Sequence, residues 1–92
     1  TPLHLAAQHG HDEVVLILLS NGAQSDAACP CHNLTPLILA AQAGESFVIQ
    51  LLLENGANIE ATSTKGTTPL LGAIEKGKDI KSVRILLEHG AD

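Results

Sequence analysis

Aromatic residues are almost missing from this chain of 92 residues: Phe47 is the only one, and there is no Trp, Tyr or Met. A chain with no aromatic rings to stack on bases and a formal net charge of −5 is not expected to bind nucleic acid. Long apolar runs are missing too. The longest is Val14–Leu19, six residues, whereas a helix needs roughly 20 to cross a bilayer. We therefore expect no membrane insertion.

Cysteine is also scarce. The chain has two cysteines, Cys29 and Cys31, which are too few for a disulfide framework. A bridge between cysteines so close in the chain would be strained, so we expect free thiols in a reducing compartment. No basic segment precedes an apolar stretch at the start, so a secretory leader is not expected either. These features predict an intracellular, most simply cytoplasmic, location.

Basic side chains are absent from residues 1–64, which carry six acidic residues. Residues 65–92 carry five basic and four acidic residues, which gives a net charge of +1. Such an asymmetry acts on the choice and steering of partners rather than on the fold. It predicts a partner that is basic or polar where it faces the first two thirds of the chain.

What the chain has in abundance is aliphatic: 45% of the residues are hydrophobic, mainly Ala, Leu, Ile and Val. This content excludes a disordered chain. The tripeptide Thr-Pro-Leu begins at Thr1, Thr35 and Thr68, at spacings of 34 and 33 residues. The first 23 residues of the first two units match at 14 positions. A period of this length predicts a solenoid with units 1–34, 35–67 and 68–92, the last irregular and truncated.

Each unit is expected to form two short helices. Thr followed by Pro favours a helix start, because the hydroxyl accepts from free N–H groups and Pro fits the first turn. Glycine after each helix lets the chain turn back. Asn33 and Gly66, which tolerate left-handed geometry, predict hairpin-like turns between units. The expected inner helices are 2–9, 36–43 and 69–76, and the outer helices are 12–20, 46–54 and 79–88.

Three segments, TPLHLAAQHGH (1–11), TPLILAAQAGE (35–45) and LLEHGAD (86–92), resemble the ankyrin repeat. The resemblance covers the whole chain. It implies an all-α solenoid of stacked helix-turn-helix units with projecting hairpin-like loops, no catalysis and no cofactor. It also implies that a partner protein binds to the loop tips and to the exposed face of the inner helices. Mapped onto this chain, those positions are Gln8, His9, Cys31, His32, Leu34, Gln42, Ala43, Thr64, Lys65, Thr67, Glu75 and Lys76.

The third unit departs from the family pattern. His4 completes the TPLH motif in the first unit only, so the family's Thr–His hydrogen bond is not expected in the other two. Gly72 lies inside a predicted helix, where it costs about 0.5–1 kcal/mol relative to Ala. Ile74 is larger than the Ala expected at its position, which predicts a change in the spacing between units.

In the first unit, Leu16 makes the outer helix apolar on its outer side and predicts a contact with flanking protein or a docking patch.

The segment Cys29-Pro30-Cys31-His32 leaves three interpretations open. Two thiols and an imidazole resemble part of a zinc site, but the C-x-C-H spacing supplies at most three ligands that lie too close together. A redox-sensitive thiol is the second interpretation, although no nearby cation lowers a thiol pKa. The third is a loop of small, partly exposed side chains. We assign no metal ligand on these grounds.

The favoured function is a protein-interaction module that binds a partner protein or peptide on its concave face and loop tips. The alternative is a structural scaffold or spacer in a larger channel, enzyme or effector whose active site lies elsewhere. Neither end shows the polar face of a capping unit, so we expect neighbouring repeats of the same chain.

Overall fold

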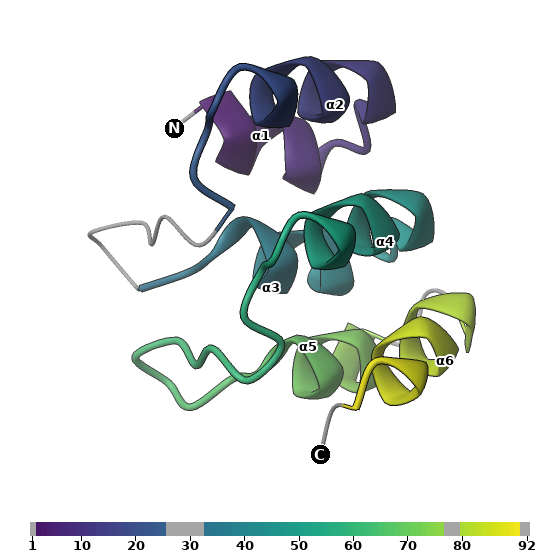
Figure 1. Cartoon of the computed structure of the whole chain (residues 1–92). Coiled ribbons are helices and arrows are strands. Elements are labelled where there is room, and N and C mark those ends of the chain that lie inside the picture. The colour runs from purple at the N-terminus through teal and green to yellow at the C-terminus, as the bar shows by residue number, and fades with distance from the viewer. Residues whose placement is uncertain (1, 26–32, 77–79, 91–92) are drawn as a thin grey trace.

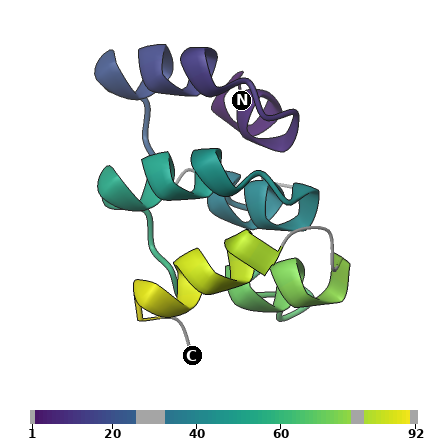
Figure 2. The same cartoon turned by 90° about the vertical axis from the view of Figure 1, so that its right-hand side faces the viewer.

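The structure, a computed structural model, describes residues 2–25, 33–76 and 80–90. Within these ranges the chain forms helices and no strand, and the helices stack as three successive pairs (Figures 1 and 2). This confirms the expected all-α solenoid. The helices are α1 (Pro2–Gln8), α2 (Asp12–Ser20), α3 (Pro36–Ala43), α4 (Ser46–Glu54), α5 (Pro69–Lys76) and α6 (Ile80–Glu88).

The helix boundaries agree closely with those expected from the sequence. Helices α2, α3, α4 and α5 have the predicted bounds. Helix α1 ends one residue early, at Gln8, although the N–H of His9 still donates to the carbonyl oxygen of Leu5 at 3.1 Å. Gly10 then adopts a φ of 69° and turns the chain. The expected start of the last helix, Asp79, lies outside the described residues, and α6 is described from Ile80.

Threonine side chains cap the inner helices of the second and third units, as predicted. The hydroxyl of Thr35 accepts from the N–H of Ile38 at 3.3 Å, and the hydroxyl of Thr68 accepts from Leu71 at 3.2 Å. Each bond satisfies one of the N–H groups that a helix start leaves without a partner. The equivalent Thr1 lies outside the described residues.

The inner helices end in a repeated backbone turn. Gly44 has a φ of 74°, and the following N–H of Glu45 donates to the carbonyl oxygen of Ala40 at 3.0 Å. The first unit repeats this bond, from His11 to Ala6, at 3.0 Å. This is the hydrogen bond of a Schellman turn, which needs a left-handed residue and therefore favours glycine. It sends the chain directly into the outer helix.

The core lies between the stacked units. It is made of small alanines on the inner helices and of larger aliphatic side chains, with almost all of its members on α1, α3, α4 and the buried sides of α5 and α6. Small residues let neighbouring helices approach, and the aliphatic side chains fill the space that remains. The core residues of the middle unit are Leu37, Ala40, Ala41, Val48, Ile49, Leu52 and Ala57.

The loop between α4 and α5 projects from the stack of helices (Figure 1). Its tip closes on Ser63, whose hydroxyl accepts from the N–H groups of Lys65 and Thr67, both at 3.2 Å. Gly66 has a φ of 80° and Asn33 a φ of 55°, so both adopt the left-handed geometry that the sequence predicts for them. The side chain of Asn33 donates to the carbonyl oxygen of Thr62 at 3.0 Å and joins successive loops.

Candidate partner-binding groove

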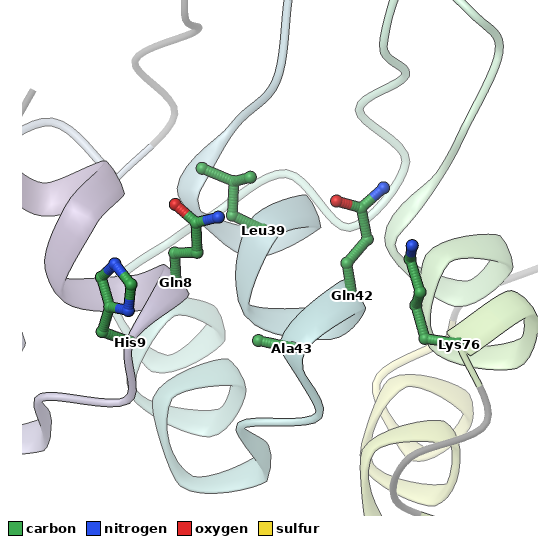
Figure 3. A pocket seen from close by; sticks show the side chains of 6 residues that line it. All are labelled: Gln8, His9, Leu39, Gln42, Ala43 and Lys76. Carbon is green, nitrogen blue, oxygen red and sulfur yellow. The ribbon is translucent and has the colours of Figure 1, made fainter.

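An open groove of about 370 Å³ runs across the ends of the three inner helices. Its lining comes from α1 and the residue after it, from α3 and from α5, so it spans all three units (Figure 3). We call it the inner-helix groove. The residues that line it are Gln8, His9, Leu39, Gln42, Ala43 and Lys76.

The repeat itself aligns these side chains. Gln8 and Gln42 hold the same position in their helices, and His9, Ala43 and Lys76 hold the next one. Stacking therefore repeats one position from unit to unit along the groove, and Figure 3 shows Leu39 between Gln8 and Gln42. The lining is mostly uncharged and polar, and Lys76 supplies its positive charge.

Helix α5 approaches α3 closely beside this groove because Gly72 has no side chain. A Cβ atom added to Gly72 would lie 3.0 Å from Cγ of Gln42 and 3.8 Å from its backbone nitrogen. The two other units carry Leu5 and Leu39 at the equivalent position. The sequence predicted only a cost for this glycine, whereas the structure shows that it makes room for Gln42.

Leu39 is the lining residue that sequence reasoning missed. It lies three residues before Gln42 and four before Ala43, which places all three side chains on one side of α3. The spacing alone contained this signal. An apolar side chain among amides and a lysine gives the inner-helix groove a place for an apolar group of a ligand.

Five of the twelve predicted partner-binding residues line the inner-helix groove, and none of the other described ones does. Glu75 is exposed on α5, outside the groove lining. Thr64 and Lys65 are exposed at the loop tip, and Thr67 is partly buried there. Their role in binding stays a prediction. Cys31 and His32 lie outside the described residues. The zinc and redox interpretations concern the same segment and therefore stay untested.

Leu34 has a structural contact that the sequence did not reveal. Its carbonyl oxygen accepts a hydrogen bond from Nε2 of the buried His4 at 2.9 Å. The bond ties the first inner helix to the chain just before the second. Ile38 and Leu71, the equivalents of His4, have no side-chain hydrogen-bond donor. The contact between the first and second units therefore differs chemically from the contact between the second and third.

Four acidic side chains of the first two units lie outside the lining of the inner-helix groove. Asp12 and Glu13 begin α2, Glu54 ends α4, and Glu60 is exposed in the following loop. None of the six residues that line the groove is acidic. Glu45 is nearer to the groove, because its carboxylate lies against Gly10, the residue that follows the lining residue His9.

Within the described ranges, no three His, Cys, Asp or Glu side chains are grouped so as to hold a metal ion. In the same part of the chain, no helix is both long and apolar enough to cross a membrane.

Comparison with known proteins identifies the family to which this architecture belongs. A family model of ankyrin repeats, described as three copies, matches residues 3–92. This chain belongs to the ankyrin-repeat family. The ankyrin repeat domain of human ASB11, known from a crystal structure, is 32% identical to this chain over 100% of its length, with a TM-score of 0.95. The chain spans 41% of that ASB11 chain. No curated protein matches it in sequence.

Ankyrin repeats are generally protein-interaction modules, and the fold itself is non-catalytic. The expectations of the ankyrin family and of its fold are thus confirmed.

Two outward-facing apolar residues of this ankyrin array are also exposed, Leu16 on α2 and Phe47 on α4. The equivalents of Leu16, Gln50 and Arg84, are exposed as well, so Leu16 is at an outward position, as expected.

Proposed function

We propose that this ankyrin array binds a protein or peptide partner along the inner-helix groove and at the loop tips. One observation carries the proposal: side chains from all three inner helices form a single continuous groove. A segment lying across α1, α3 and α5 meets copies of the same helix position in succession. At the loop tips, Thr64, Lys65 and Thr67, together with the predicted Cys31, His32 and Leu34, extend the surface that we assign to the partner.

The groove chemistry favours a polar, extended ligand. The carboxamides of Gln8 and Gln42 both donate and accept hydrogen bonds, which suits the backbone groups of an extended segment. Leu39 supplies an apolar contact. Lys76 attracts an acidic or carbonyl group at the third unit, while the acids of the first two units attract a partner that is basic overall.

Peptides selected on the 92-residue chain from a random display library provide the probe for a test. We expect the Gln42→Ala, Lys76→Ala double variant to lower peptide affinity at least tenfold, about 1.4 kcal/mol. The matched control is Gln50→Ala with Lys81→Ala, because both residues are exposed on outer helices. The peptide affinity of this control variant should stay within about twofold of the affinity of the unchanged chain. Equal losses in both double variants would show that the ligand binds elsewhere.

The distant acidic charge gives the proposal a kinetic signature. Charges outside a contact surface mainly change the association rate, and salt screens them over about 8 Å at physiological ionic strength. For a basic ligand, we expect the association rate to fall between 20 mM and 500 mM salt while the dissociation rate changes less. An association rate independent of salt would exclude this steering. A reducing, intracellular compartment, as inferred from the two cysteines, completes the proposal.

A further inference from the structure

One repeat position beside the inner-helix groove changes from leucine to glycine in the third unit. Leu5, Leu39 and Gly72 are equivalent in the repeat. Leu39 is partly buried and lines the groove, whereas Gly72 is buried and does not line it. The groove therefore has an apolar side chain at this position in the second unit and no side chain at the same position in the third.

Side chains from two neighbouring elements cover Gly72. A Cβ atom added to this glycine would lie 3.0 Å from Cγ of Gln42 on α3 and 3.7 Å from Cγ2 of Thr67, in the loop before α5. The aliphatic stem of Gln42 thus lies in the space that a leucine would need. Carbon atoms in contact prefer a separation of about 3.5–4.0 Å, so a side chain at position 72 would push Cγ of Gln42 away from α5.

This contact decides which part of the groove is open. Leu39 precedes Gln42 by three residues, on the same side of α3, and Figure 3 shows Gln42 between Leu39 and Lys76. With its stem against Gly72, Gln42 leaves the side chain of Leu39 open to a ligand. Displaced from α5, the same side chain would move towards Leu39 and cover it.

The arrangement offers two different contacts along the groove. Leu39 offers an apolar one, while the carboxamide of Gln42 and the ammonium group of Lys76 both donate hydrogen bonds, which suits a carboxylate. We propose that Gly72 is a positioning residue that sets the specificity of the inner-helix groove through Gln42. The ligand that fits is a segment with an apolar side chain for Leu39 and a carboxylate for Gln42 and Lys76. This inference rests on the proposed binding of a peptide in the groove and adds which side chains that peptide carries.

Two peptides measure the apolar specificity. The first is selected on the 92-residue chain from a random display library, and the second has alanine at the apolar residue on which binding of the first depends most. The unchanged chain should bind the first about tenfold more tightly, because the larger side chain buries more apolar surface. Leu39→Ala should abolish this preference. Gly72→Ala should reduce it about threefold or more, and the further substitution Gln42→Ala should restore it.

A third peptide measures the carboxylate contact. Replacing the acidic residue of the first peptide by its amide should weaken binding to the unchanged chain about fivefold, because a charge-assisted hydrogen bond is lost. The same replacement should have almost no effect on binding to the Lys76→Ala variant. An equal effect on both chains would show that the carboxylate binds elsewhere, and the carboxylate part of the proposal would be wrong.

Ser82→Ala is the matched control for a substitution to alanine in the third unit. Ser82 is buried on the outer helix α6, and its hydroxyl has no hydrogen-bond partner among the described residues. Its replacement changes the packing of the unit without touching Gln42, so the ratio of the affinities for the leucine-type and alanine peptides should not change. A merely structural role of Gly72 would lower both affinities equally, whereas a positioning role changes their ratio.

Nuclear Overhauser contacts in the free chain provide a readout that needs no ligand. The Cγ protons of Gln42 should contact the Cα protons of Gly72 in the unchanged chain, and they should contact the methyl groups of Leu39 more strongly in Gly72→Ala. Unchanged contacts in Gly72→Ala would overturn the inference. An unchanged affinity ratio in Gly72→Ala would also overturn it, and it would do so alone if Gln42→Ala with Lys76→Ala still weakens binding. If that double variant binds as tightly as the unchanged chain, the proposed function fails as well.

Discussion

At the scale of single residues, one position of the inner helices shows how packing overrides helix propensity. Leu5, Leu39 and Gly72 are equivalent in the repeat, yet Leu5 is exposed, Leu39 is partly buried and Gly72 is buried. Glycine is unfavourable inside a helix. Here its absent side chain leaves room for Cγ of Gln42, which a Cβ atom would approach to 3.0 Å. The gap at Gly72 therefore shapes the inner-helix groove.

The substitution Gly72→Leu, which restores the residue of the other two units, should lower the free energy of unfolding by about 1–3 kcal/mol, the usual cost of overpacking. Urea unfolding followed by circular dichroism measures the change. Gly72→Ala is the matched control: its Cβ meets a flexible side chain and it gains helix propensity, so we expect a change of less than about 1 kcal/mol. Adding Gln42→Ala should recover part of the loss in Gly72→Leu. Strict additivity of the two substitutions would contradict the contact.

At the scale of the elements, the helices are short, from seven to nine residues. Helices of this length are marginal in isolation, since nucleation is costly and few hydrogen bonds follow it. Their ends are nevertheless well defined, because Thr35 and Thr68 cap two of them and Gly10 and Gly44 adopt left-handed geometry after the inner helices. Local sequence therefore sets where a helix begins and ends, and stacking makes it stable.

Removing a cap tests this division of roles. Thr68→Ala deletes the acceptor for the N–H of Leu71 and should lower the free energy of unfolding by about 1 kcal/mol. Thr68→Ser keeps the hydroxyl and should stay close to the unchanged chain. Hydrogen exchange at the Leu71 amide provides the local measurement: faster exchange is expected in Thr68→Ala only. Equal exchange in both variants would show that the hydroxyl does not protect this amide.

At the scale of the whole molecule, stability depends on neighbouring units more than on any one unit. The middle unit packs against a unit on each side, and α3 contacts both α1 and α5. Its core residues are almost completely buried, whereas some equivalents in the end units, such as Val14 and Ile74, are about half exposed. This is the nearest-neighbour behaviour expected of a solenoid, in which each unit is stabilised mainly by the next.

A pair of equivalent residues measures this dependence. Ile38→Ala in the middle unit should lower the free energy of unfolding by about 2–5 kcal/mol, because a fully buried side chain leaves a cavity. Leu71→Ala removes a side chain of similar size at the same position of the third unit, where it is half exposed, and should cost less than about 1 kcal/mol. Chemical unfolding of both variants gives the comparison. Similar losses would mean that position in the stack does not decide the energetic role.

Much of the inner-helix groove could be predicted from the sequence. The resemblance to the ankyrin repeat assigns Gln8, Gln42 and Lys76 to one surface, and all three line the inner-helix groove. Leu39 is absent from the predicted set, although its helical spacing from Gln42 places it on the same side. The contact between His4 and Leu34 could not be predicted, because it joins residues 30 positions apart through a ring orientation that only packing determines.

The sequence by itself determined the repeat, the helix ends and the aliphatic nature of the core, since alanine and leucine build the stack without aromatic residues. These are local properties: a capping hydroxyl, a left-handed glycine and a period of 33 or 34 residues act within one unit. Only the tertiary structure decided which identical positions are buried and which are open. Burial depends on the neighbour that packs against a side chain, so Ile38 and Leu71, at the same place in the repeat, have different environments.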